Sequence, residues 1–321
     1  MRPSPRRPVR ALLCPASLKG VLTARAAAAA LARGVRGAGG DAVELPIADG
    51  GEGTADALHS ALGGTWRDAI VSDPLARPVA ARWLVLEDGR AVVEAAPAIG
   101  LPLLTPGERD PLVASSRGLG ELVLAALREE PHELLVGLGG SATVDGGAGV
   151  REVLRKLPVP TRVLCDVRTT LADAARLFGP QKGASAEGVA VLERRLAGME
   201  ELQPYAGLAG SGAAGGLGAA FAALGAELVA GAPAVLDLVG FDERLHDADL
   251  VVTGEGQVDE TTAEGKAPGV VAERCAAAGV RCVVFGGRVL TDVDGAEAVS
   301  LSGDRASAED DLEALGRRLV A

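Results

Sequence analysis

Short apolar runs alternate with alanine-rich stretches along most of the chain. The runs have the length of buried strands, and the alanine-rich stretches have the length and spacing of helices. Glycine-containing segments separate most runs from the helix that follows, which is typical of an α/β fold with a mainly parallel sheet. We therefore predict strands at 10–14, 42–47, 133–138, 162–167, 249–253, 281–285 and 296–301, and helices from 23 to 35, with Thr23 as the N-cap, and from 55 onward.

The region from 64 to 104 has a different pattern. Three apolar runs at 66–71, 79–86 and 91–95 follow one another with only short turns, and Asp88-Gly89 is a hairpin signal. Antiparallel strands joined in this way indicate a second domain inserted in the first. We predict a Rossmann-like domain formed by residues 1–60 and 113–321, and a smaller inserted α/β domain at 61–112, to which 203–245 is a candidate addition.

Charge and composition exclude some classes of partner. The 321-residue chain carries a net charge of −11, whereas proteins that grip a nucleic-acid backbone need a basic surplus. The chain has few aromatic side chains that could stack on nucleic-acid bases: four Phe, two Trp and one Tyr. Nucleic acid is therefore not expected as a partner, but a small phosphorylated ligand needs only a local positive site.

The cysteines and the longest weakly charged stretch bear on location. Cys14, Cys165, Cys275 and Cys282 form no CxxC pair, so we expect reduced thiols in a cytoplasmic protein. Residues 207–236 carry one charge, but glycines interrupt them too often for a membrane span.

The basic, proline-rich residues 1–10 are expected to be a loose tail. A homodimer is compatible with the sequence, which does not fix the oligomeric state.

Candidate chemistry lies where the predicted strands end. Ligands of open α/β sheets bind outside the carboxyl ends of the strands, and five ends here combine glycine with an acid, a hydroxyl or a lysine. Uncovered amides can cradle phosphate, and carboxylates can hold Mg²⁺. Neither a Walker A motif nor a dinucleotide fingerprint fits. Residues 210–215 match G-x-G-x-x-G in letters only, because no strand precedes them, so a Rossmann dehydrogenase is excluded.

Eight segments together resemble one known family. They read SLKG at 17–20, PIADGGEGT at 46–54, GLGGSAT at 137–143, DGGAG at 145–149, FGPQKGA at 178–184, GAAGGLG at 212–218, TGEG at 253–256 and GKAP at 265–268. In this order they resemble the bacterial glycerate kinase family, of the type that transfers phosphate from ATP to D-glycerate, and the resemblance covers nearly the whole chain. It implies a two-domain α/β fold, ATP and Mg²⁺ as cofactors, and phosphoglycerate as product, with 2-phosphoglycerate favoured.

The resemblance implies roles for particular residues. Lys19 is expected to contact a phosphate or the glycerate carboxylate, and Asp49 or Asp166 is expected to be the catalytic base, with no choice between them. Asp49 is also a candidate for holding Mg²⁺. The candidates for binding ATP are Gly139, Gly140, Ser141, Thr143, Lys182, Gly254 and Lys266, and those for binding the metal are Glu52, Asp145, Glu255 and Asp259.

Some positions depart from the family pattern. They are Ala16, Arg117, Val144, Arg168, Gln257 and Thr261, several of which replace polar residues in loops of the expected site. Arg117 is a candidate to supply the positive charge lost at Gln257. The departures keep two alternatives open: a kinase for another small hydroxy acid, or a catalytically impaired relative that binds nucleotide or glycerate.

Overall fold

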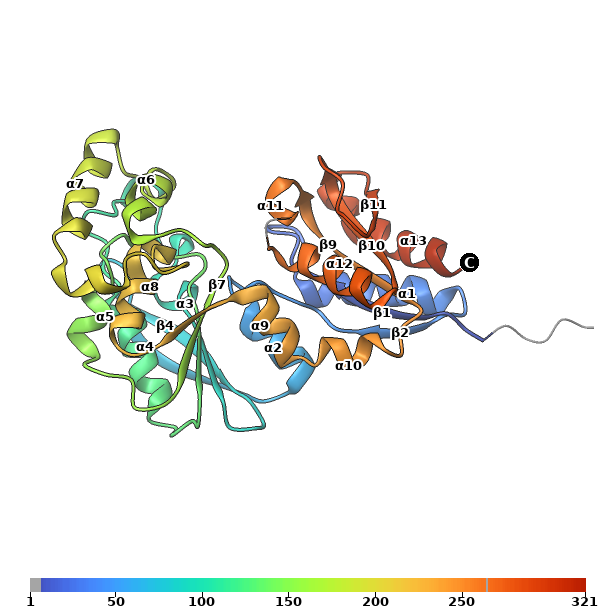
Figure 1. Cartoon of the computed structure of the whole chain (residues 1–321), viewed down its shortest axis with the longest axis horizontal. Coiled ribbons are helices and arrows are strands. Elements are labelled where there is room, and N and C mark those ends of the chain that lie inside the picture. The colour runs from blue at the N-terminus through green and yellow to red at the C-terminus, as the bar shows by residue number, and fades with distance from the viewer. Residues whose placement is uncertain (1–6, 264) are drawn as a thin grey trace, which may run out of the picture. The chain divides into compact units, whose positions relative to one another are not determined.

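The structure is a computed structural model that describes residues 7–263 and 265–321. Residues 1–6 of the predicted tail lie outside the described part. The chain forms two compact units (Figure 1). Of the described residues, unit 1 comprises 7–48, 56–61, 235–263 and 265–321, and unit 2 comprises 49–55 and 62–234. Each unit has a sheet of its own.

Unit 1 contains a five-stranded parallel sheet in the order β11-β10-β9-β1-β2. Its strands are β1 (Arg10–Pro15), β2 (Asp41–Glu44), β9 (Leu250–Val258), β10 (Arg281–Val289) and β11 (Glu297–Ser300). Its helices are α1 (Ala24–Gly37), α10 (Phe241–Leu245), α11 (Glu260–Ala263), α12 (Ala267–Ala278) and α13 (Ala308–Val320), with a 3₁₀ turn at Arg305–Ser307. The Thr23 hydroxyl accepts the Ala26 amide at 3.1 Å, which confirms the predicted cap of α1.

Side-chain alternation along the strands explains the layers of unit 1. Ala11 and Leu13 point to one face, where they join a core with Leu31 of α1 and Leu312 of α13. Cys282, on β10, points to the opposite face and contacts Cys275 of α12. The sheet is therefore buried on both faces, as its near-continuous apolar strands require.

Unit 2 contains a six-stranded mixed sheet in the order β3-β4-β5-β6-β7-β8. The antiparallel strands β3 (Thr65–Ser72), β4 (Pro78–Val85) and β5 (Ala91–Glu94) confirm the predicted hairpins. The strands β6 (Leu134–Gly137), β7 (Thr161–Cys165) and β8 (Glu227–Ala230) continue in parallel with β5. Its helices are α3 (Ala96–Ile99), α4 (Arg117–Leu127), α5 (Ala148–Val153), α6 (Ala174–Phe178), α7 (Ala186–Ala197) and α8 (Ala213–Ala223), while α2 (Thr54–Leu62) and α9 (Gly231–Leu238) each contain residues of both units.

The division of the chain corrects the predicted domain boundary. Residues 113–234 belong to unit 2 and not to the Rossmann-like remainder, because β6 pairs in parallel with β5 and extends the sheet that the hairpins begin. The inserted unit is consequently the larger one. The predicted α/β class with two domains is confirmed.

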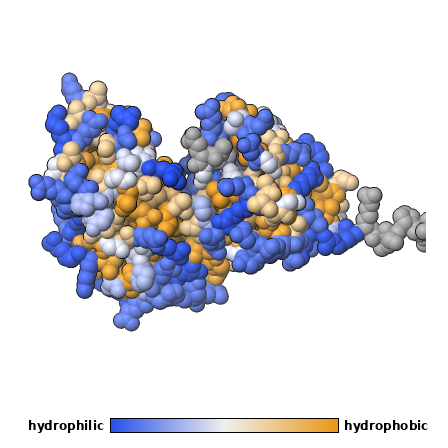
Figure 2. All heavy atoms as spheres, viewed as in Figure 1, coloured by the Kyte–Doolittle hydropathy of each residue, from blue (hydrophilic) through white to orange (hydrophobic). Residues whose placement is uncertain are grey.

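Two strands of unit 1 run further than predicted. The glycine segments at 254–256 and 286–287 lie inside β9 and β10, because these strands stay paired as far as Val258 and Val289. Polar residues cover most of the face of each unit shown in Figure 2, with smaller apolar areas between them. In the described part of the chain, no helix has the length and apolar character needed to cross a bilayer.

We expect Gly34→Ala to destabilise the protein by roughly 1–3 kcal/mol, because α1 and α13 meet there with no room for a side chain. A Cβ atom at Gly34 would lie 2.0 Å from the Glu313 carbonyl oxygen and 2.7 Å from the Arg317 amide nitrogen. Chemical denaturation followed by circular dichroism measures the effect. The matched control is Gly37→Ala at the end of α1, where a Cβ meets nothing within 4 Å and alanine is the better helix former. Equal destabilisation by both changes would refute the packing explanation.

Candidate active site

A polar pocket of about 590 Å³ lies in unit 1 at the carboxyl ends of its parallel strands. We call it the unit 1 pocket. Lys19 follows β1, Glu255 and Asp259 lie on and just after β9, and Arg288 lies on β10. The pocket is where a parallel α/β sheet ordinarily binds its ligand.

Charges of both signs line the unit 1 pocket. The Lys266 ammonium lies 3.7 Å from Glu255 Oε2 and 3.8 Å from Asp259 Oδ1. Lys19, Arg288 and Arg305 add positive charge. An anion that enters therefore meets four cationic side chains beside carboxylates able to hold a cation.

Two residues that depart from the family pattern hold Asp259. The Thr261 hydroxyl and amide donate to Asp259 Oδ1, and Gln257 Nε2 donates to Oδ2 at 2.9 Å. These hydrogen bonds, with Lys266 adding a smaller effect, lower the pKa of Asp259 to about 2. Gln257 and Thr261 thus keep this carboxylate ionised and oriented.

Gly254 does not line the unit 1 pocket. It lies within β9, and a Cβ there would meet the Phe285 carbonyl oxygen of β10 at 2.2 Å. The structure therefore gives Gly254 a packing role, whereas Glu255 and Gly256 line the pocket.

In unit 2, the loop after β6 meets a buried lysine. We call residues 138–147 the β6 loop. Lys182, from the 3₁₀ turn Pro180–Lys182, is 3% exposed and donates to Ser141 Oγ at 3.0 Å and to the Thr143 carbonyl oxygen at 2.8 Å. The structure thus brings together Ser141, Thr143 and Lys182, three of the candidates for binding ATP.

Burial lowers the pKa of Lys182 from 10.5 to about 7, because the charged ammonium loses its hydration. Asp145 and Asp166 oppose this shift with smaller attractions. Lys182 can therefore exist in either protonation state near neutral pH.

Close backbone approach supports the β6 loop. Gly215 and Gly216 interrupt α8 with left-handed φ angles of 74° and 96°. A Cβ at Gly215 would lie 2.3 Å from the Thr143 carbonyl oxygen, and its own carbonyl accepts the Gly146 amide at 3.0 Å. Only glycine fits there, which accounts for the glycine-rich segment at 212–218.

Asp49 and Asp166 face the same glycine. A Cβ at Gly51 would lie 3.0 Å from Asp49 Oδ1 and 3.8 Å from Asp166 Oδ2, and Asp49 Oδ1 accepts the Gly51 amide at 3.1 Å. Glu52 Oε2 lies near Gly140, 3.6 Å from the position of its Cβ. The predicted carboxylates thus gather beside the glycines of the β6 loop.

Sequence reasoning missed Glu94, which holds the loop that carries Asp49 and Glu52. Its Oε1 accepts the Gly53 amide at 2.8 Å and the Thr54 amide at 2.9 Å, at the start of α2. A carboxylate at this helix end is favourable because it satisfies free amides. The sequence does contain one sign of this role, because Glu94 is the single acid in the otherwise apolar run 91–95.

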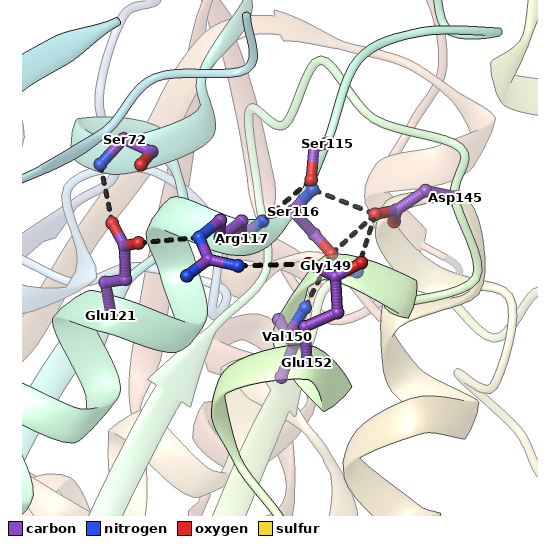
Figure 3. Close-up of polar contacts among 9 residues, drawn as sticks. All are labelled: Ser72, Ser115, Ser116, Arg117, Glu121, Asp145, Gly149, Val150 and Glu152. Atoms are coloured by element: carbon purple, nitrogen blue, oxygen red, sulfur yellow. Dashed lines mark hydrogen bonds and ion pairs between the residues drawn. The ribbon is translucent and has the colours of Figure 1, made fainter. Parts of the chain in front are cut away.

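Asp145 is buried and its carboxylate is fully engaged (Figure 3). Oδ2 accepts the Ser116 amide at 2.9 Å, the Ser116 hydroxyl at 2.7 Å and the Gly149 amide at 3.2 Å, and Oδ1 accepts the Gly147 amide at 3.0 Å. Four donors at one carboxylate indicate that Asp145 fixes the start of α4 to the start of α5.

Arg117 begins α4 in unit 2, and Gln257 lies on β9 in unit 1. The Arg117 guanidinium donates to Glu121 at 2.9 Å and to Glu152 at 3.1 Å, and Figure 3 draws both contacts. Both acids form ion pairs with the guanidinium, so Arg117 links the surfaces of α4 and α5.

The four predicted metal ligands are divided between the two units. Glu52 and Asp145 belong to unit 2, and Glu255 and Asp259 belong to unit 1. Within residues 7–263 and 265–321, no three His, Cys, Asp or Glu side chains are grouped as a metal site.

The fold and the polar clusters define a two-unit α/β enzyme, and comparisons with known proteins define its family. A family model described as "Glycerate kinase family" matches residues 11–157 and 155–309. "Glycerate 2-kinase" of Escherichia coli K12 is 38% identical over 305 residues, covering 81% of this chain and 80% of the relative. "Glycerate kinase" of Bacillus subtilis 168 is 36% identical, covering 88% and 86%. A crystal structure assigned as glycerate kinase 2 from Salmonella typhimurium LT2 superposes with a TM-score of 0.85 at 32% identity over 98% of each chain.

The chain belongs to the glycerate kinase family. It is accordingly a kinase, as the resemblance of its glycine-rich segments implied.

We expect Asp145→Asn to destabilise the protein by about 3 kcal/mol, because an amide nitrogen would face donors that now meet a carboxylate oxygen. The measurement is denaturant unfolding in two separate buffers, one with EDTA and one with Mg²⁺ and no chelator. A structural Asp145 makes the loss independent of Mg²⁺. A variant as stable as the wild type in EDTA would contradict this role.

We expect the stability of the wild type to rise between pH 7 and 8.5 relative to that of Lys182→Met. In this window the unfolded chain keeps a proton on Lys182 that the native protein releases, so raising the pH favours the native state. The slope of the difference is at most about 1.4 kcal/mol per pH unit. Burial raises the pKa of the Cys165 thiol to about 12. At higher pH the unfolded chain therefore loses thiol protons that the native protein keeps, and this lowers the stability of both proteins. Parallel stability curves from urea unfolding would show that Lys182 stays protonated.

Proposed function

We propose that the chain transfers the γ-phosphate of ATP to D-glycerate and releases 2-phosphoglycerate. The observation that carries the proposal is 38% identity over most of the chain with a relative named glycerate 2-kinase. The segments that include Lys19, Lys182 and Lys266 lie in polar clusters suited to anions. The four free, buried cysteines support action in the reducing cytoplasm.

The unit 1 pocket binds the donor nucleotide in this proposal. Its volume of about 590 Å³ is far larger than a three-carbon acid requires and is in the usual range for a nucleotide-sized ligand. Lys19 and Lys266 neutralise phosphate charge, which phosphoryl transfer demands. Leu18 and Leu301 provide apolar surface for the nucleoside.

Mg²⁺ fits beside Glu255 and Asp259 only together with the nucleotide. Protein-bound Mg²⁺ commonly takes one or two carboxylates and completes its octahedron with water and phosphate oxygens. The two acids share Lys266 at distances of 3.7 and 3.8 Å, so neither is locked in a short ion pair with it. When bound, the ion would neutralise the phosphates. The engaged carboxylate of Asp145 is not a ligand in this proposal.

The acceptor binds in unit 2, beside Asp49 and Asp166. Asp49 and Asp166 both lie near Gly51, and their carboxylates can accept hydrogen bonds from the hydroxyl groups of a small hydroxy acid. Gly139 and Gly140 present backbone without side chains, so their amides are suited to contact the transferred phosphoryl group.

The decisive test is a coupled ADP-release assay with Mg-ATP and a panel of small hydroxy acids, followed by NMR identification of the product. We expect turnover with D-glycerate and phosphate on the 2-hydroxyl. Lys19→Met should raise the KM for ATP by about tenfold or more, because a cation that contacts phosphate is lost, and leave the KM for glycerate within about threefold.

The control is Lys156→Met, a change of the same kind outside both polar clusters, which should leave both KM values unchanged. Turnover with a different hydroxy acid would move the proposal to that acceptor, as the departures at Ala16 and Arg168 allow. Thermal stabilisation by ATP without turnover on any acceptor would identify an impaired relative and reject the kinase proposal for this chain.

A further inference from the structure

The contact between Lys182 and Ser141 has a feature that binding phosphate does not explain. The two side chains are 3% and 4% exposed, and their Nζ and Oγ atoms are 3.0 Å apart. An ammonium that serves only as a positive charge is best placed where a ligand reaches it directly. Here the hydroxyl of Ser141 is bonded to the amine.

Lys182 is held in one position. The Thr143 carbonyl accepts a second hydrogen bond from Nζ at 2.8 Å, and the ring of Phe178 has its centroid 5.8 Å from Nζ. The charged groups that act on it are Asp145, from the β6 loop, and Asp166, after β7. Asp145 already accepts four hydrogen bonds, so its charge is largely satisfied elsewhere. No described acid lies within ion-pair distance of the amine, whose pKa falls to about 7 as a result of burial.

We propose that Lys182 acts as the proton acceptor of the kinase reaction through the hydroxyl of Ser141, which contacts the acceptor substrate. The proposal rests on the proposed function and assigns a step within it. Lys182 is a positioning and proton-accepting residue behind Ser141, and Asp49 and Asp166 orient the acceptor without taking its proton.

The proposed step transfers one phosphoryl group and one proton. The acceptor hydroxyl oxygen forms a bond to the γ-phosphorus while the bond from that phosphorus to the bridging oxygen of ADP breaks. The acceptor hydroxyl proton moves to Ser141 Oγ as the proton of Ser141 moves to neutral Lys182 Nζ, which becomes an ammonium. Ser141 ends unchanged, and the ammonium returns its proton to water before the next cycle.

The first test is the dependence of kcat on pH at saturating substrates, which reports groups in the bound complex. For the wild type we expect kcat to rise with pH through a limb near 7. Lys182→Arg keeps the positive charge but cannot lose its proton, so we expect a loss of at least 100-fold in kcat and no such limb. A variant that keeps kcat within tenfold would show an electrostatic role and overturn the relay.

Ser141→Ala tests the relay if arginine does not fit at position 182. It should lower kcat about 100-fold and leave both KM values within about threefold, with no change in the Mg-ATP dependence of thermal unfolding. The matched control is Ser211→Ala. Ser211 is also buried in unit 2, where its hydroxyl bonds to the Leu171 amide and the Ala206 carbonyl, so its loss should lower stability without moving the pH limb. Equal pH profiles for wild type and Ser141→Ala would overturn the proposal.

NMR titration of the Lys182 side-chain nitrogen separates this inference from the proposed function. Inactivity of the wild type on every hydroxy acid would reject the proposed function alone. A Lys182 titration near pH 7 in the folded protein would still support a proton-accepting amine at this position, whereas a titration above pH 9 would reject the relay whatever the acceptor.

Discussion

The buried carboxylate of Asp145 is the interaction on which the candidate site of unit 2 depends. It accepts hydrogen bonds from amides at the starts of two helices and from the Ser116 hydroxyl. A buried charge is tolerated only when such donors replace its lost hydration. Because Asp145 lies four residues after Ser141, the same network also fixes the β6 loop that Lys182 contacts. A residue with the chemistry of a metal ligand therefore works as the internal support of the β6 loop.

The sequence predicted most strands and the strand ends that carry the polar residues. Hydrophobic runs specify strands locally, and the carboxyl ends of parallel strands share one edge of a sheet, so Lys19 and Glu255 could be expected together. Neither the hydrophobic runs nor the position of the strand ends determines which strands pair in a sheet. The boundary near 113 was wrong because the pairing of Val92 with Leu135 joins segments some forty residues apart, and local patterns carry no information on that register.

Side-chain roles were less predictable than positions. In the sequence, Asp49 and Asp145 look alike, because each is an acid directly before two glycines. In the structure, Asp49 accepts the Gly51 amide, whereas Asp145 accepts three amides and a hydroxyl. Only the hydrogen-bond donors that surround each carboxylate in the structure distinguish the two environments. Departures from the family pattern were equally ambiguous in sequence, yet Gln257 and Thr261 both bond to Asp259 and preserve the local order that the change of residue seemed to remove.

Only four of the 32 Lys and Arg residues are lysines, and the surroundings of these lysines suggest a physical reason. The chain uses arginine for its surface ion pairs, as at Arg117 and Arg274, where a permanent charge and a planar fork are sufficient. At Lys266, a compact ammonium lies 3.7 Å from Glu255 and 3.8 Å from Asp259. At Lys182, burial without a bonded acid brings the pKa to about 7. Arginine cannot give up its proton in a protein, so only lysine among the strongly basic side chains can both stabilise an anion and accept a proton there.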